Sequence, residues 1–166
     1  GVQKMEIGSM NKIQLAGLLS KVTGTLEDDI KESQASISGD FSKADSVVGI
    51  SSYMESIFYN LISNAIKYKH PGRKPVITVQ SQMLDEYVQI DISDNGLGIN
   101  LDVHKETLFS LYKRLHFHVD GRGLGLYLVK TQVTALGGKI DVKSKEGEGT
   151  VFSVWIKNFS PAETIA

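Results

Sequence analysis

The chain has 166 residues, of which 41% are hydrophobic and 22% charged, a composition typical of one globular domain with its own core. Its formal net charge of -1 gives no electrostatic basis for binding nucleic acid or an acidic membrane surface. Cysteine is absent, which excludes disulfides, thiol catalysis and thiolate metal sites. No apolar run approaches the roughly 20 residues that span a bilayer, and no signal-peptide pattern is present. We therefore expect a cytoplasmic domain without direct membrane contact, while an anchor elsewhere in a parent protein stays open.

The hydrophobic pattern divides the chain into helices and strands, because apolar residues recur every three or four positions in some segments and alternate in others. The first part of the chain is predicted to form a helix over 13–33, weakly interrupted at Gly24, strands over 35–41 and 47–50, and a helix from 51 or 52 to about 69. A hairpin over 76–83 and 87–93 follows, and then a lid over 100–121 with a helical piece over 106–115. The last predicted elements are a helix over 126–136 and a hairpin over 139–144 and 150–157. Residues 1–10 are interpreted as a linker, 11–158 as one domain and 159–166 as a tail.

Strands and helices are segregated along the chain, which indicates the α+β class. We expect one mostly antiparallel sheet with helices on one face, the other face being free for solvent or for a partner. Ser52 and Glu55 stand at the spacing of a capping box at the start of the second predicted helix.

The second predicted helix carries a polar stripe. Asn60, Asn64, Lys67 and Tyr68 follow one another at i, i+4, i+7 and i+8, so they share one helical face. Two amides, a cation and an aromatic ring suit a nucleotide, with the amides for a hydrated metal, Lys67 for phosphate and Tyr68 for the edge of a base. The same stripe is also what a solvated helix face would carry.

A glycine turn follows the predicted strand over 87–93. Asp94 opens the turn, and a carboxylate at this place can accept a hydrogen bond from an exocyclic amino group such as that of adenine. Gly96 and Gly98 have no side chain that would keep a base at a distance. The alternative is an ordinary Asp-Asn-Gly turn with no ligand.

Cations and glycines precede the third predicted helix. Tyr112-Lys113-Arg114 could bring a cation to a terminal phosphate, or could be a solvated helix face. Gly121, Gly123 and Gly125 then lead directly into the helix, where free N–H groups attract anions. These glycines predict a phosphate cradle, with a flexible hinge as the alternative.

Taken in this order, and followed by a Gly-x-Gly-Thr turn at 147–150, the motifs resemble the ATP-binding catalytic domain of sensor histidine kinases. That family belongs to the superfamily of gyrase, the ninety-kilodalton heat-shock chaperones and the MutL proteins. The resemblance covers Gln14 to Lys157 and implies the Bergerat fold, a two-layer α/β sandwich with an ATP lid. We expect residues 100–121 to be mobile without nucleotide, because little apolar surface anchors them.

The resemblance also assigns roles to residues. It implies that Asn64 holds Mg²⁺ with support from Asn60, and that Asp94 bonds the adenine amino group. Lys67 and Arg114 contact phosphate oxygens, and with Asn60 they form the expected catalytic set. The full ATP-binding set expected is Asn60, Asn64, Lys67, Tyr68, Asp94, Gly96, Gly98, Ile99, Tyr112, Lys113, Arg114, Gly121, Gly123, Leu124, Gly125, Leu126 and Thr150.

Two departures from the family pattern bear on function. Hydrolysing relatives have a glutamate at the place of Asn60, and an amide cannot take a proton from water at neutral pH. Asn60 therefore favours phosphoryl transfer over ATP hydrolysis. No histidine precedes His70, so a phosphoacceptor histidine on a helical hairpin is absent from the sequence.

We therefore expect a domain that binds ATP and Mg²⁺ without phosphorylating itself. The expected partners are its own upstream dimerisation and phosphoacceptor domain and the receiver domain of a response regulator. Two alternatives stay open at this stage: a serine kinase of the anti-sigma type with the same fold, and a nucleotide-binding interaction module without catalysis.

Overall fold

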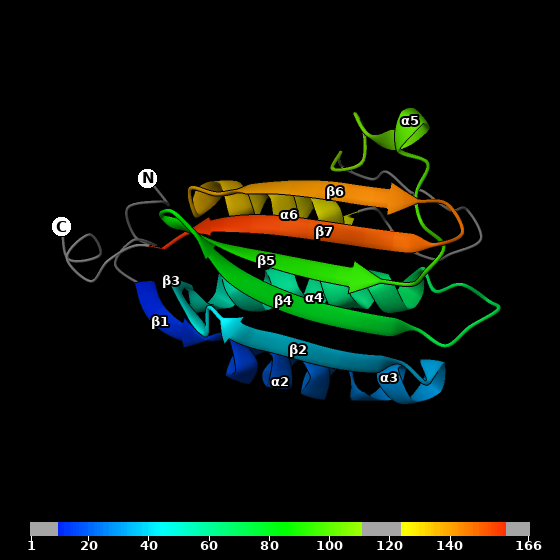
Figure 1. Ribbon diagram of the computed structural model, residues 1–166, viewed down its shortest axis with the longest axis horizontal. Helices are drawn as coiled ribbons and strands as arrows, with labels where there is room; N and C mark the ends of the chain where they lie inside the picture. The colour runs from blue at the N-terminus through cyan, green and yellow to red at the C-terminus, as the bar shows by residue number, and fades with distance from the viewer. Residues whose placement is uncertain (1–9, 111–123, 159–166) are drawn as a thin grey trace.

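The computed structural model describes residues 10–110 and 124–158, which form two layers (Figure 1). A five-stranded sheet has the order β2 (Ser36–Lys43), β4 (Val76–Leu84), β5 (Tyr87–Asp94), β7 (Gly149–Lys157) and β6 (Lys139–Lys145). The pair β2–β4 is parallel and the other pairs are antiparallel. A separate two-stranded antiparallel sheet joins β1 (Met10–Gln14) to β3 (Ser46–Ile50).

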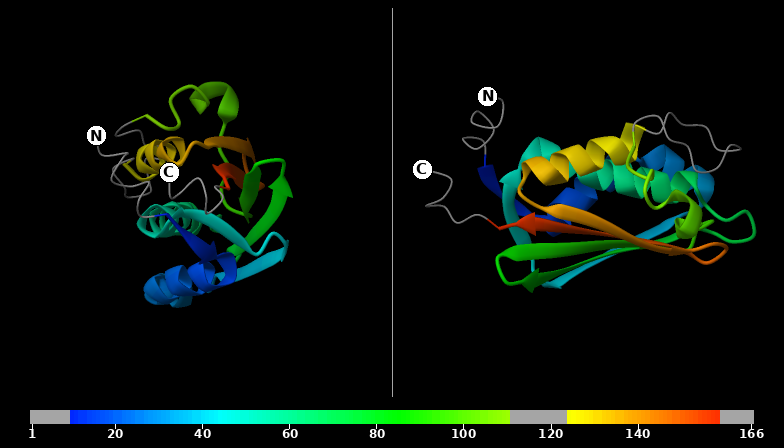
Figure 2. Two further views of the ribbon diagram at one scale, coloured as in Figure 1. Left: turned by 90° about the vertical axis from the view of Figure 1, so that its left-hand side faces the viewer. Right: turned by 90° about the horizontal axis from the view of Figure 1, so that it is seen from above.

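Helices cover one face of the large sheet, as the view from above shows (Figure 2). They are α2 (Leu15–Thr25), α3 (Glu27–Ser33), α4 (Ser51–Lys67) and α6 (Leu124–Ala135), and a short α5 (Leu101–His104) follows β5. The predicted α+β sandwich with a mostly antiparallel sheet is therefore confirmed. No helix among the described residues is long and apolar enough to cross a membrane.

The core lies between α4 and the inner face of the sheet. The predicted apolar face of α4, from Leu61 to Ile66, is buried, and Phe58 one turn earlier is fully inaccessible. Every second residue of β5 points at this helix, and Val88, Ile90 and Ile92 are at most 1% exposed. This packing places the carboxyl-terminal end of α4 beside the end of β5.

The prediction of a helix over 13–33 is wrong about where the helix starts and where it is interrupted. Residues from Met10 to Gln14 form β1, which is too short for its pattern to separate a strand from a helix. The break falls at Leu26, which is 2% exposed, because burial of this side chain redirects the chain between α2 and α3. Gly24, where the break was expected, lies inside α2.

Two local predictions around other helices are also wrong. No side chain caps α4, and the expected capping residue Glu55 instead pairs with Lys21 at 2.6 Å. A helical turn follows β5 at α5, where the Asn100 side chain accepts hydrogen bonds from two backbone N–H groups. Residues 105–110, in which the expected helical piece began, form turns, and the rest of that piece lies outside the described residues.

The start of the expected lid is also anchored more firmly than its sequence indicates. Leu108 is 2% exposed, and the ring of Phe109 meets the ring of Phe152 edge-on at a centroid distance of 6.3 Å. The reason given for mobility, a lack of apolar anchors, therefore does not apply to this part of 100–121.

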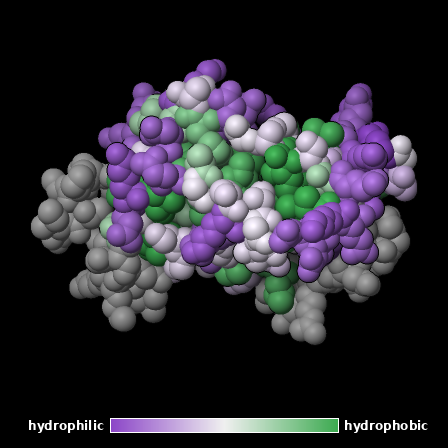
Figure 3. Space-filling model, turned by 90° about the horizontal axis from the view of Figure 1, so that it is seen from below, coloured by the Kyte–Doolittle hydropathy of each residue, from purple (hydrophilic) through white to green (hydrophobic). Residues whose placement is uncertain are grey.

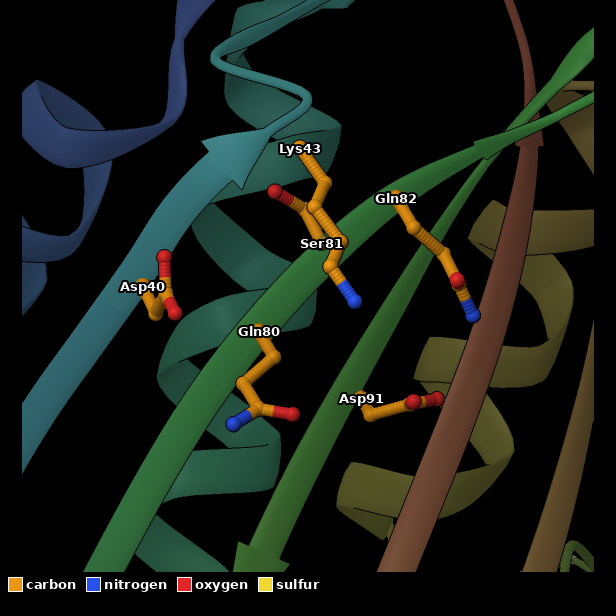
Figure 4. A pocket seen from close by; sticks show the side chains of 6 residues that line it. All are labelled: Asp40, Lys43, Gln80, Ser81, Gln82 and Asp91. Carbon is orange, nitrogen blue, oxygen red and sulfur yellow. The ribbon is translucent and has the colours of Figure 1, made fainter.

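The open face of the sheet is a polar surface built from aligned side chains. Two register rows cross all five strands in the order β6, β7, β5, β4, β2: Lys139, Trp155, Gln89, Gln82 and Lys43, and beside it Asp141, Ser153, Asp91, Gln80 and Asp40. A shallow groove at the β2 end of these rows is seen in Figure 4. Seen from below, this side of the molecule shows apolar residues across its centre, with hydrophilic residues around them (Figure 3).

Candidate functional site

A small pocket lies where the end of α4 meets the end of β5 and the start of β7. Its lining residues are Asn64, Ala65, Tyr68, Asp94, Gly98, Ile99, Leu126, Thr150 and Phe152. Most of them belong to the set expected from sequence, although they come from segments far apart in the chain. The walls are largely apolar, with a carboxylate, an amide and a hydroxyl among them, as in sites for small organic ligands.

Asp94 supplies the carboxylate of this pocket. Its Oδ1 accepts a hydrogen bond from the backbone N–H of Gly96 at 2.8 Å, and the backbone N–H of Thr150 also donates to this side chain. Burial raises the pKa of Asp94 to about 6, an effect that the two backbone donors oppose without cancelling. At neutral pH the carboxylate is therefore largely ionised and is a strong acceptor for a donor group on a ligand.

Two glycines of the turn after β5 are required by close backbone contacts. Gly98 has φ of +72°, and a Cβ placed on it would lie 2.1 Å from the carbonyl oxygen of Lys145. A Cβ on Gly96 would lie 2.6 Å from the carbonyl oxygen of Tyr68. We expected these glycines to allow the close approach of a base. The space beside each α-carbon is instead filled by the protein's own backbone.

A small polar cluster closes the floor of the pocket. Thr150 is 6% exposed, and its hydroxyl lies 2.7 Å from that of Ser144. The same Ser144 oxygen accepts a hydrogen bond from the backbone N–H of Ile99 at 2.8 Å. Ser144 was missed by the sequence reasoning, since a single serine in a strand carries no signal of this role.

Arg73, in the loop between α4 and β4, was also missed. Its guanidinium donates to the carbonyl oxygens of Asn95 at 2.7 Å, Gly96 at 3.2 Å and Gly147 at 2.7 Å. The Asn95 side chain in turn bonds the backbone at the start of β4, accepting from Val76 at 2.9 Å. Arg73 and Asn95 thus fasten the turn that follows Asp94 to its neighbours.

Other residues of the expected set lie outside the pocket lining. The Asn60 amide donates to the carbonyl oxygen of Ser56 at 2.8 Å, and its Oδ1 would lie 3.0 Å from a Cβ placed on Gly125. Lys67 and Leu124 are exposed. Gly96 supports the turn without lining the pocket. The positions Tyr112, Lys113, Arg114, Gly121 and Gly123 lie outside the described residues.

The donor set of the pocket fits a magnesium ion that is held mainly by a ligand's phosphates. Within 10–110 and 124–158, no three His, Cys, Asp or Glu side chains converge on a common metal position. Asn64 lines the pocket, and its side chain carries an amide oxygen. Mg²⁺ commonly keeps several waters and binds through few protein oxygens plus substrate phosphates, which this arrangement suits.

Comparison with known proteins identifies the family to which this fold and pocket belong. A two-layer sandwich with a pocket between its central helix and the strand ends is that of the Bergerat ATP-binding domains. The sequence profile of the histidine kinase-, DNA gyrase B- and HSP90-like ATPases matches residues 49–159. The chain belongs to this family, and the resemblance drawn from the motifs is thereby confirmed.

The curated relatives include a phytochrome and a sensor histidine kinase. Cyanobacterial phytochrome A of Nostoc sp. is 32% identical over 136 residues, which is 81% of this chain and 17% of that protein. The sensor histidine kinase AtsR of Burkholderia thailandensis is 31% identical over 151 residues, 86% of this chain and 24% of that protein. The chain thus spans less than a quarter of the length of these relatives.

Among solved structures, the catalytic domain of the histidine kinase ThkA, in a nucleotide-free form, has a TM-score of 0.76 at 24% identity. The match covers 93% of this chain and 98% of that one. Full-length ShkA in complex with AMPPNP also has a TM-score of 0.76, at 22% identity, covering 90% of this chain and 31% of that one. Both likenesses confirm the fold.

Proposed function

We propose that this is the ATP-binding catalytic domain of a sensor histidine kinase. It binds Mg²⁺-ATP and transfers the γ-phosphate to a histidine on a separate dimerisation domain. The observation that carries the proposal is Asp94, an ionised carboxylate in an otherwise mainly apolar pocket of the family's fold. Such a group accepts a hydrogen bond from the adenine amino group, while Ile99 and Phe152 contact the faces of the base.

Phosphates of a nucleotide in this pocket would be met by the polar side chains of α4. Asn64 would hold the metal, which would supply positive charge to the phosphate oxygens. Lys67, exposed at the end of α4, would contact the phosphates, and we propose the same role for Arg114, which lies outside the described residues. Their work is positioning and charge stabilisation, which is the main contribution of proteins to phosphoryl transfer.

The side chain of Asn60 favours phosphoryl transfer over ATP hydrolysis. This side chain is an amide, and its nitrogen is engaged by Ser56, so α4 offers no carboxylate at this place to activate water. In the transfer, the bond from the γ-phosphorus to the bridging oxygen breaks and a bond to an imidazole nitrogen forms. ADP leaves and a proton is released to solvent. An aspartate on a response regulator receives the phosphoryl group in the next step.

Two measurements test this function. Calorimetric titration with Mg²⁺-ATP should show binding to the wild type and much weaker binding to Asp94→Asn. With ATP labelled at the γ-phosphate, label should appear on an added dimerisation domain that carries the histidine, and not on this chain alone. Label on the isolated chain that is stable to base and labile to acid would contradict the proposal. An absence of binding heat, equal for both proteins, would indicate an interaction module instead.

A further inference from the structure

Arg73 makes an unusual set of contacts for an exposed arginine. All three of its hydrogen bonds go to backbone carbonyl oxygens, those of Asn95, Gly96 and Gly147. Within the described part of the chain no carboxylate pairs with it. A guanidinium holds its donors in a fixed fork, so it fixes the relative positions of the groups that it bonds.

One of these contacts leads directly to Asp94. Arg73 Nε donates to the carbonyl oxygen of Asn95 at 2.7 Å, and that carbonyl belongs to the same planar peptide unit as the N–H of Gly96. The N–H of Gly96 donates to Asp94 Oδ1 at 2.8 Å. The peptide is therefore held at its oxygen by a cation and at its N–H by the carboxylate. Hydrogen bonds in such a chain polarise and strengthen one another.

The same side chain joins the turn to a second segment. Gly147, at the tip of the β6–β7 hairpin, accepts from Arg73 and donates its N–H to the carbonyl oxygen of Leu97 at 2.7 Å. Leu97 donates in turn to the carbonyl oxygen of Tyr68, the residue after α4, at 2.9 Å. Arg73 thus bridges the hairpin and the turn at the place where both meet the end of α4.

We propose that Arg73 is a positioning residue that sets the selectivity of the pocket for adenine over guanine. By fixing the Asn95–Gly96 peptide, it fixes the direction in which Asp94 presents its other carboxylate oxygen to a ligand. Adenine offers an amino group to that oxygen, whereas guanine has a carbonyl oxygen at the same ring position, which a carboxylate repels. The inference rests on the proposed function, because it concerns the base end of the same site.

The test compares nucleotide binding to the wild type, Arg73→Ala, Arg73→Lys and a control, Lys74→Ala. Lys74 is the adjacent exposed cation, and only its backbone takes part in the turn, so Lys74→Ala removes the same charge without the guanidinium contacts. Dissociation constants for ATP, ADP and GTP are measured by calorimetry in Mg²⁺ at pH 7.5. Thermal unfolding of each variant shows whether it is fully folded at the temperature of the titration.

Arg73→Ala should weaken ATP and ADP binding by the same factor, about tenfold, because the loss is at the base and not at the γ-phosphate. GTP binding should change less, so the ratio of GTP to ATP dissociation constants should fall. Arg73→Lys should give an intermediate result, because an ammonium can replace only part of the fork, and Lys74→Ala should match the wild type. The pH below which ATP binding is lost should rise in Arg73→Ala, since the Gly96 N–H would stabilise the carboxylate less.

An unchanged ratio of the GTP and ATP dissociation constants in folded Arg73→Ala would overturn the inference. The proposed function would stay intact. If Arg73→Ala proved too unstable to study, the same ratio and pH comparison in Arg73→Lys decides the question. A wild type that bound no adenine nucleotide would overturn the proposed function, and this inference with it.

Discussion

The raised pKa of Asp94 predicts that Asp94→Asn stabilises the protein while it weakens the nucleotide site. Burial raises this pKa from the ordinary 3.8 to about 6, so the folded state holds the proton more tightly than the unfolded state. Stability from this group is therefore fully present below pH 3.8 and is lost as the pH rises through 6. A difference of roughly two pKa units corresponds to about 3 kcal/mol.

An asparagine has no charge to desolvate and keeps one oxygen that can accept from the Gly96 and Thr150 N–H groups that Asp94 bonds. Above pH 6, the unfolding free energy of the nucleotide-free Asp94→Asn variant should exceed that of the wild type by up to about 3 kcal/mol. The wild type should lose stability as the pH rises from 4 to 6, and the variant should not show this loss. Its affinity for ATP should drop by roughly 10- to 100-fold, since a hydrogen bond to a charged group is worth about 1.5–3 kcal/mol.

Urea unfolding at intervals from pH 4 to 8 measures the first effect, and calorimetric titration at pH 7.5 measures the second. The opposite signs of the two effects are the decisive feature, because general damage to the fold would lower both quantities. Parallel stability curves for the wild type and the variant across this pH range would refute the reasoning about burial.

Other substitutions test neighbouring features. Gly98→Ala should cost at least about 2 kcal/mol in urea unfolding, because its Cβ would meet the Lys145 carbonyl, whereas Gly147→Ala, with positive φ but open space, should cost about 1 kcal/mol. Asn64→Ala should reduce ATP affinity in Mg²⁺ but leave affinity in EDTA unchanged, as paired titrations would show. Phe58→Ala should lower the unfolding free energy by about 3–5 kcal/mol, measured by the same urea titration, because this core side chain is fully buried.

The features that sequence predicted well are those with a local, repeating signal. The apolar period of α4 predicts its buried face, and alternation predicts β4, β5, β6 and β7 closely. The family could be recognised because its motifs occur in a characteristic order along the chain. These signals need no knowledge of which segments meet in space.

The features that sequence missed depend on contacts between distant segments. Arg73 reaches Gly147 across 74 positions, and Ser144 reaches Ile99 across 45, so neither contact leaves a local pattern. A lone arginine after Pro-Gly is indistinguishable from a solvated loop residue until the hairpin is placed beside it. The break at Leu26 was missed for the same reason, since burial and not the flexibility of Gly24 decides where the helix ends.

The side chain of Asn158 joins the end of the large sheet to the small one. At the end of β7 it accepts from the N–H of Val48 in β3, and Val48 pairs with Lys12 in β1, so the first and last described strands are joined at one place. In Figure 1 the β1–β3 sheet lies at the left, whereas the arrowhead that ends β5 points to the right. Replacing Asn158 by alanine would leave the Val48 N–H without this acceptor, at the place where β3 meets the end of β7.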